Sequence, residues 1–240
     1  MNARFAAPAV SLAALVLAGC GSNHCDFCDA DPSGIYEGSA TDTTTQKSLP
    51  AVAVIDENGD GRMLVTNGDY YRLSLGTSGD SLYGSFLAFP GNHTTFSGSL
   101  SGQVTQPGLS ATLAAQGQDT QNLSLNFDNI YLYSSSLPTL AGNWSLSTTG
   151  YSLTLTIQAS GAVSGSDTTG CTYNGFFSLV DPNFNAYSET FTQVCGATSI
   201  NYSGLSYYIP ASGSGTNATP AMIDILADDN NGHFVSALVH

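Results

Sequence analysis

The chain has 240 residues, with 4 Lys or Arg against 18 Asp or Glu and a formal net charge of −14 at pH 7. So few cations cannot neutralise a phosphate backbone, which excludes nucleic acid as a partner. Charged residues make up only 9% of the chain and hydrophobic residues 42%, so the chain has enough apolar content for a folded core while Ser, Thr, Asn and Gly supply most of its polarity.

The first residues predict a secretory signal peptide, residues 1–19. A short start that carries Arg4 is followed by an uncharged apolar and small-residue run over residues 5–18. This run is too short to span a bilayer, which needs about 20 apolar residues. A positive start before a brief apolar run is the layout of an export signal.

The apolar run ends in Leu17, Ala18, Gly19 and Cys20, a motif that resembles the lipobox of bacterial lipoproteins. The resemblance implies that Cys20 becomes the diacylated, palmitate-bearing first residue of the mature chain, with the membrane as its partner. Acyl chains contribute about 0.8 kcal/mol per buried CH₂, so two or three of them anchor a protein firmly. In Gram-negative lipoproteins an Asp after the lipidated Cys usually retains the protein in the inner membrane, so for a Gram-negative source Gly21 favours the outer membrane. The alternative is that Cys20 is an ordinary residue at a cleavage site.

Residues 20–33 are polar and are expected to form a lipidated tether. Within it, Cys25 and Cys28 form a Cys-x-x-Cys beside His24. A redox site of this kind belongs at a helix N-terminus, and a structural zinc needs four ligands, whereas this segment supplies neither. We therefore expect a small local disulfide between Cys25 and Cys28, with a redox or metal site as the alternative.

From Ile35 onward, apolar and polar residues alternate, which is typical of half-buried strands, and we find no persuasive helical stretch. Residues 58–61, 78–80, 160–161 and 230–232 are typical of hairpin turns. Between turns the pattern predicts about eight strands in each half. Their centres lie near Tyr36, Val52, Leu64, Leu73, Phe86, Phe96, Leu113 and Leu125, then near Trp144, Leu155, Val163, Phe176, Thr190, Tyr202, Ile223 and Val235.

This pattern predicts an all-β protein with two tandem small up-and-down antiparallel barrels, at residues 34–133 and 140–240. Eight strands joined in sequence can close and so avoid exposed edges. Gly142, Asn143 and Trp144 also resemble the Gly-x-Trp opening of lipocalins and related calycins. The resemblance implies that Trp144 plugs the closed end of a calycin-like barrel, with Tyr36 in its place in the first half.

Two other all-β arrangements are alternatives. The halves could form one long sandwich in which Trp144 is ordinary core. A transmembrane barrel would also alternate, but the short Gly- and Ser-rich strands and the ending Leu238, Val239 and His240, without a terminal aromatic residue, argue against it.

Cys171 and Cys195 lie on strands separated only by hairpins, and four cysteines remain after Cys20, as an oxidising compartment permits. We therefore predict a Cys171–Cys195 disulfide that stabilises the second barrel by roughly 3 kcal/mol.

Asp56, Asn58 and Asp60 match the start of a calcium-binding loop. The twelfth position is Asn67, where an EF-hand requires Glu, and the flanks are strands. A hairpin turn is the favoured interpretation, calcium is the alternative, and no cofactor is expected.

The sequence offers few candidate catalytic residues. Its four histidines are His24, His93, His233 and His240, and neither a Gly-x-Ser-x-Gly nor a His-Glu-x-x-His motif occurs. We expect a non-enzymatic envelope lipoprotein that serves as an interaction or structural module. The Gly-, Ser-, Asn- and Tyr-rich segments 207–210 and 211–219 are candidate loops for an envelope partner. The alternative is a carrier that binds a small apolar ligand or lipid against an inward row that includes Phe86, Phe96, Tyr151 and Phe176, although the same row would also fill a closed core.

Overall fold

The computed structural model describes residues 29–91, 94–105, 107–214 and 218–240. The predicted signal peptide, the lipidation of Cys20 and the Cys25–Cys28 disulfide lie outside these residues, as does His93. Among the helices described, none is long and apolar enough to cross a membrane.

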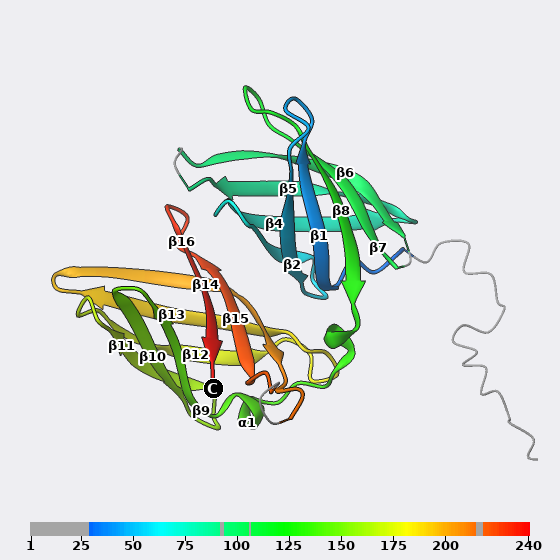
Figure 1. Cartoon of the computed structure of the whole chain (residues 1–240). Helices are drawn as coiled ribbons and strands as arrows, with labels where there is room; N and C mark the ends of the chain where they lie inside the picture. Colours follow the sequence, from blue (N-terminus) through cyan, green and yellow to red (C-terminus); the bar gives the residue numbers. More distant parts are fainter. Residues whose placement is uncertain (1–28, 92–93, 106, 215–217) are drawn as a thin grey trace, which may run out of the picture.

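The first barrel contains eight antiparallel strands in sequence order, closed between its first and last strand (Figure 1). Strands β1 and β8 pair over eight residue positions, from Ile35 with Asp128 to Asp42 with Gln121. The strands are β1 (Gly34–Asp42), β2 (Ser48–Ile55), β3 (Asp60–Val65), β4 (Tyr70–Ser78), β5 (Ser81–Phe89), β6 (Phe96–Thr105), β7 (Gly108–Ala114) and β8 (Gln121–Asp128).

The second barrel has the same order of strands but a weaker closure. Its first and last strands pair at one position only, Ser145 with Val239. The strands are β9 (Gly142–Thr148), β10 (Tyr151–Ile157), β11 (Ala162–Asp167), β12 (Thr172–Leu179), β13 (Tyr187–Cys195), β14 (Thr198–Ile209), β15 (Met222–Asp228) and β16 (His233–Val239).

The predicted fold class is therefore confirmed. Each predicted strand centre falls in a strand of its own, and each of the four turn sequences joins two neighbouring strands. The connection between the barrels differs from expectation because it contains two single-turn helices, η1 (Asn129–Leu132) and α1 (Leu137–Leu140). The Asp128 carboxylate accepts the Ile130 N–H at 2.9 Å and so caps η1 locally, which strand periodicity does not reveal.

The same device secures the first strand of both barrels. Trp144 Nε1 donates to the Leu140 carbonyl at 2.7 Å, and Tyr36 Oη donates to the Pro32 carbonyl at 3.0 Å. Both aromatic side chains are buried in the core of their own barrel, and both bond a carbonyl four residues upstream. The two halves thus share a local feature that their sequences only partly share.

The predicted Cys171–Cys195 disulfide is confirmed, with Cα atoms 4.3 Å apart. It joins the residue before β12 to the last residue of β13, across one hairpin. Because it closes a chain segment with a sequence separation of 24, its expected contribution is roughly 3 kcal/mol.

The predicted inward row is correct for Phe86, Phe96 and Tyr151, which pack in or against the barrel cores. It is wrong for Phe176, whose side chain is 60% exposed on the outer face. The reason is the register of β12: alternation sends Tyr173 and Phe177 inward, so Phe177 takes the core position. In a Phe-Phe pair, composition alone cannot decide which residue faces the core.

The expectation of a loop at residues 207–210 is also wrong. Strand β14 continues to Ile209, with Tyr207 buried between the barrels and Tyr208 packed against the second core. The chain leaves the strand at Pro210, which has no N–H for a further ladder bond.

Candidate functional site at the junction between the barrels

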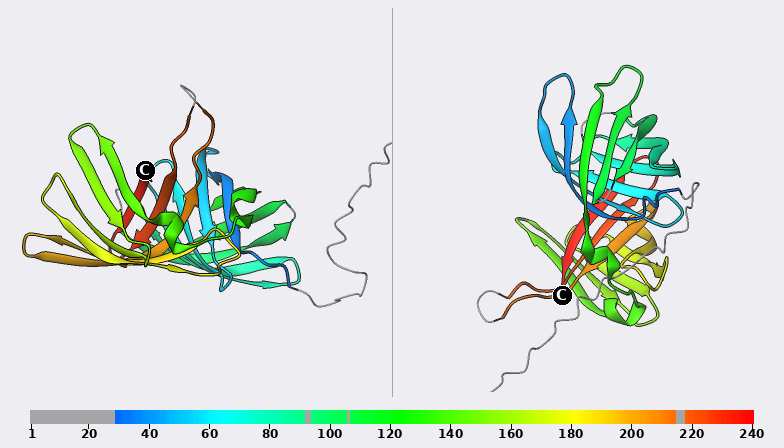
Figure 2. Two further views of the ribbon diagram at one scale, coloured as in Figure 1. Left: turned by 90° about the horizontal axis from the view of Figure 1, so that it is seen from below. Right: turned by 90° about the vertical axis from the view of Figure 1, so that its right-hand side faces the viewer.

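The two barrels pack together along their outer faces (Figure 1; Figure 2). The first barrel contributes mainly β1 to β5, and the second contributes β14 to β16 and the segment before β13. These strands bury side chains on both faces, so the junction forms a third apolar core between the two lumens. Its buried members are Ile35, Val54, Tyr70, Phe89, Tyr131, Ala186, Leu205, Tyr207 and Leu226.

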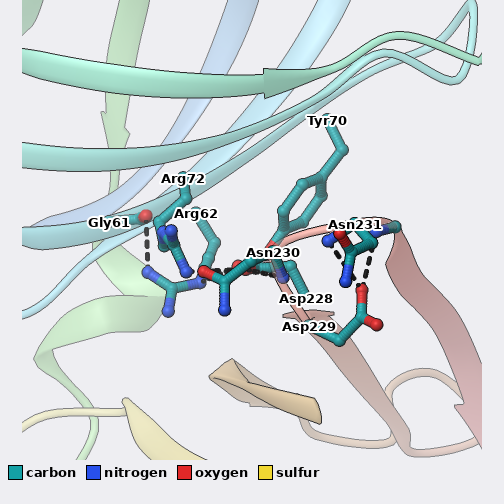
Figure 3. A network of polar contacts seen from close by, with 9 residues as sticks. Gly61, Arg62, Tyr70, Arg72, Asp228, Asp229, Asn230 and Asn231 are labelled. Atoms are coloured by element: carbon teal, nitrogen blue, oxygen red, sulfur yellow. Dashed lines mark hydrogen bonds and ion pairs between the residues drawn. The ribbon is translucent and has the colours of Figure 1, made fainter. Parts of the chain in front are cut away.

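A fully buried carboxylate, that of Asp228 at the end of β15, faces two arginines of the other barrel (Figure 3). Arg72 Nη1 lies 2.8 Å from Oδ1, and Arg62 Nε lies 3.3 Å from Oδ2. The Tyr70 hydroxyl donates to Oδ2 at 3.4 Å. The Asp228 side chain has no exposed surface and that of Arg62 only 10%, so little water screens the contact between them. The Arg72 side chain is 32% exposed, so its contact with Asp228 is partly screened.

The two arginines stand directly opposite each other in the ladder between β3 and β4. Like charges in this arrangement destabilise a sheet unless an acid lies between them. Arg62 and Arg72 are two of the three Lys or Arg residues in the described structure, and the third, Lys47, is exposed. Most of the positive charge of the folded chain is therefore held against one carboxylate.

Aromatic rings cover this ion pair. The Tyr70 ring stacks on the His233 ring with centroids 5.1 Å apart and meets Phe89 edge-on at 5.6 Å. Burial raises the pKa of Tyr70 well above its ordinary value. Burial also lowers the pKa of His233, against the opposing effect of the Asp228 and Asp69 carboxylates. Both rings are therefore neutral at pH 7, and the cluster contains two positive charges and one negative.

The connection between the barrels is bonded to both of them. The Tyr131 hydroxyl donates to Glu57 at 2.7 Å in the first barrel, and its ring stacks on Phe184 of the second, with centroids 4.9 Å apart. Asn185 Nδ2 donates to the Ile130 carbonyl at 3.2 Å and to the Tyr208 carbonyl at 2.7 Å. These bonds fix η1 between the barrels.

Core side chains fill the middle of both barrel lumens. At one mouth of the first barrel a cavity of about 170 Å³ remains, lined by the core residues Ala40 and Val65 and by polar side chains such as Asn67. A cavity lined by Tyr71, Phe86 and Phe96 lies in the first barrel. The volume within which the centre of a water molecule can lie is only about 10 Å³. The cavity beside Phe177 and Phe191 in the second barrel is equally small. Each of these two small cavities has room for about one water molecule, so a larger ligand would have to displace core side chains.

A carboxyl group, that of Glu189, lies inside the second lumen. Its Oε2 accepts a hydrogen bond from Ser206 Oγ, whereas its Oε1 has no hydrogen-bond partner among the described residues, and neither does Ser236 Oγ. Gly204 makes room for it, because a Cβ there would lie 2.6 Å from Oε1. Burial raises the pKa of Glu189 to about 8, although the Ser206 hydrogen bond and the Arg62 charge act in the opposite direction. At pH 7 this side chain is predominantly protonated.

The candidate calcium residues form a hairpin turn between β2 and β3. Asp56 Oδ1 accepts the N–H groups of Asn58 and Asp60, each at 2.9 Å, so the carboxylate is used within the turn. Within the described residues, no group of three or more His, Cys, Asp or Glu side chains is arranged to hold a metal ion.

Sequence reasoning missed the group formed by Arg62, Arg72 and Asp228. The two arginines are unusual in a chain that has so few cations, and both stand in alternating apolar strands. That pattern could have marked them as junction residues, but their partner is 166 and 156 positions away, and nothing local indicates it.

No family model matches the chain, and no curated protein and no solved structure shows significant similarity to it.

The ion pair at the junction predicts a large effect of Asp228→Asn on stability. The change leaves the buried Arg62 and the partly exposed Arg72 without a counter-charge, so the free energy of unfolding should fall by about 3 kcal/mol. Urea unfolding followed by circular dichroism measures this. Asp80→Asn, in the exposed turn between β4 and β5, is the matched control for the lost negative charge and should change stability by less than about 0.5 kcal/mol. Equal effects of the two variants would contradict the assigned role of Asp228.

The buried carboxyl of Glu189 predicts a pH-dependent effect of Glu189→Gln. In the unfolded chain the group ionises near pH 4.5, and in the folded protein its pKa is about 8. Between these values the folded state binds more protons, so this group lowers wild-type stability as pH rises, by at most about 1.4 kcal/mol per pH unit. Gln cannot ionise and should remove this component.

The measurement is urea unfolding of both proteins at several pH values between about 5 and 8. The stability of the Gln variant relative to wild type should increase steadily across this range. A difference that stays constant with pH would show that Glu189 does not have a raised pKa in the folded protein.

Proposed function

We propose that the chain is a lipid-anchored lipoprotein of the bacterial cell envelope that acts without catalysis, as an interaction or structural module. The observation that carries the proposal is that the described interior leaves little room for a ligand. Core side chains fill the middle of both lumens, and the Asp228 carboxylate is bound by its own arginines. Apart from a cavity of about 170 Å³ at one mouth of the first barrel, what remains available to a partner is the outer surface of two barrels held in one orientation.

The anchor in this proposal is Cys20, at the end of the lipobox-like motif, and Gly21 favours the outer membrane. The described chain supports attachment through the first barrel, because the segment before β1 is bonded to the turn between β4 and β5. Ala30 N–H donates to the Gly79 carbonyl at 2.8 Å, and Gly79 N–H donates to Asp29 Oδ1 at 2.6 Å. Residues 20–28 can bridge at most about 30 Å, which would keep the first barrel near the membrane.

A second candidate function is a calycin-like carrier that holds a small apolar ligand in the second barrel. Two observations favour it. Glu189 Oε1 and Ser236 Oγ are buried without hydrogen-bond partners among the described residues, and a polar end group on an otherwise apolar ligand could supply them. The single ladder pair between β9 and β16 also makes this barrel the easier of the two to open.

The lipid anchor predicts the outcome of Cys20→Ala in a lipoprotein-processing Gram-negative host fed radiolabelled palmitate. The wild-type protein should carry the label and fractionate with the outer membrane. The variant should carry no label, because the acylated thiol is gone. Cys25→Ala is the control and should remain labelled. Label in the Cys20→Ala protein, or none in the wild type, would refute the anchor.

Native mass spectrometry of the mature lipidated protein in detergent separates the two functions. For an interaction or structural module, the mass should equal the polypeptide plus its acyl chains, less the hydrogens lost to disulfides. For a carrier, an additional stoichiometric mass should be present and should disappear on denaturation. Such a mass would displace our first proposal.

A further inference from the structure

The outward side chains of β9 to β14 form a continuous row across six strands of the second barrel. Ladder pairing places one residue from each strand in it, and all are at least partly exposed. Neighbouring strands are about 4.8 Å apart, so the row extends roughly 24 Å around the barrel. We call it the amide–hydroxyl row; its members are Asn143, Thr156, Ser164, Asn174, Thr192 and Asn201.

A second row runs parallel to it, two residues along each strand. Eleven of the twelve positions in the two rows are Ser, Thr or Asn, one is Val, and none is charged. Such a surface offers hydrogen-bond donors and acceptors in a regular array without any net charge. The second row consists of Ser145, Thr154, Ser166, Thr172, Val194 and Ser199.

Hydrogen bonds within the amide–hydroxyl row hold two of its asparagines in place. Thr156 Oγ1 donates to Asn143 Oδ1 at 2.9 Å, and Thr192 Oγ1 donates to Asn201 Oδ1 at 2.6 Å. Each bond occupies an amide oxygen and leaves the amide nitrogen available as a donor at the surface. Side chains fixed in this way lose less conformational entropy when they bind a partner.

A large exposed aromatic side chain, that of Phe176, borders the row. It is 60% exposed, although Phe177 beside it already fills the core position. Single exposed apolar side chains are common on proteins, so Phe176 is a candidate for binding because it lines a groove beside the row. Together these side chains line a shallow open groove of about 520 Å³ over β12 to β14; the outward ones are Asn174, Phe176, Thr190, Thr192, Asn201 and Ser203.

The charge of the surroundings narrows the class of ligand. The chain after Arg72 contains no Lys or Arg, so an anionic polymer would be repelled. None of the six acidic residues of the second half belongs to either row, and none lines the groove. A cationic peptide would therefore find no negative charge there to bind. These acidic residues are Asp167, Asp181, Glu189, Asp224, Asp228 and Asp229.

An uncharged sugar chain fits the remaining chemistry. The C–H face of a pyranose ring carries partial positive charge and stacks on the negative face of an aromatic ring. The hydroxyl groups at the edge of the ring both donate and accept hydrogen bonds. They can therefore pair with the amide and hydroxyl groups of the row, which also do both. The spacing of the strands is comparable to the length of one hexose unit, so successive sugars can meet successive side chains.

We propose that the groove over β12 to β14 binds a neutral polysaccharide, with Phe176 stacked on one sugar ring and the amide–hydroxyl row bonded to its hydroxyls. The hairpin that joins β13 to β14, at one end of this groove, extends away from the first barrel (Figure 2). The proposal rests on the chain being an interaction module. It names the chemistry of the partner, which the module assignment alone leaves open.

The first barrel has a comparable solvent-facing row, formed by Ser48, Thr41, Asn122, Thr112 and Ser101, and this row ends at Tyr83. Asp42 and Lys47 flank its Thr41 and Ser48 end, so the row is not free of charge. We therefore assign the polysaccharide site to the second barrel.

Affinity electrophoresis of the purified mature protein, lipidated or not, in native gels with a nonionic detergent tests the proposal. Without Arg4, the mature chain has 3 Lys or Arg against 18 Asp or Glu, a formal net charge of −15, so it migrates toward the anode. The gels contain a soluble β-glucan, a galactomannan, dextran or, for comparison, anionic polygalacturonate. At least one neutral polysaccharide should retard the wild-type protein, and polygalacturonate should not.

Phe176→Ala should raise the apparent dissociation constant roughly ten-fold, and the Asn174→Ala/Asn201→Ala double variant should do the same. Tyr133→Ala removes an equally exposed aromatic side chain, 55% exposed, from the connection between the barrels and should leave retardation unchanged. Thermal unfolding by circular dichroism checks each variant, and because the double variant alters only exposed side chains it tests the site even if Phe176→Ala fails to fold.

Absence of retardation by every neutral polysaccharide would overturn the proposal. Retardation that neither groove variant weakens would overturn it too, because the sugar would then bind elsewhere. The outcome is independent of the palmitate experiment, since binding is measured on purified protein. An unlabelled protein that still binds polysaccharide would refute the anchor alone.

Discussion

The carboxylate of Asp228 determines how the two barrels can be joined. Arg62 and Arg72 face each other across β3 and β4, on a surface that is otherwise apolar and lies against the second barrel. Without an acid, the buried Arg62 and the partly exposed Arg72 would face each other as unpaired like charges, which destabilises the junction. The last hairpin of the second barrel supplies this acid, so the junction requires both barrels to be folded and correctly aligned.

Two of the three Lys and Arg side chains among the described residues are held in that junction, so the exposed surface that the structure describes carries few positive charges. Its exposed strand faces carry Ser, Thr and Asn, and cross-strand Thr–Asn hydrogen bonds recur in both barrels. Because these interactions involve no charge, they are insensitive to ionic strength, unlike surface ion pairs. A surface of this kind suits contact with a polar, uncharged partner in an environment of variable salt.

Period-two alternation and turn residues were sufficient to predict the sixteen strands and their division into two barrels. These signals are local, and each strand reports its own amphipathic face. The direction of Phe176 could not be predicted, because two adjacent Phe residues satisfy the pattern equally well in either register. The Arg62–Asp228 contact and the amide–hydroxyl row are beyond local sequence reasoning for the same reason. Both depend on which strands become neighbours and in what register.

The weak closure of the second barrel gives the protein a built-in optical probe. Trp144, the only tryptophan of the chain, lies on β9 at the seam, and its ring is 5.0 Å from that of His240 just beyond β16. Because this seam has one ladder pair, it should open at a lower free energy than the rest of the fold. The fluorescence of Trp144 should therefore change when the seam of the second barrel opens. The fluorescence of the tyrosines, which lie in both barrels, should change when the whole molecule unfolds.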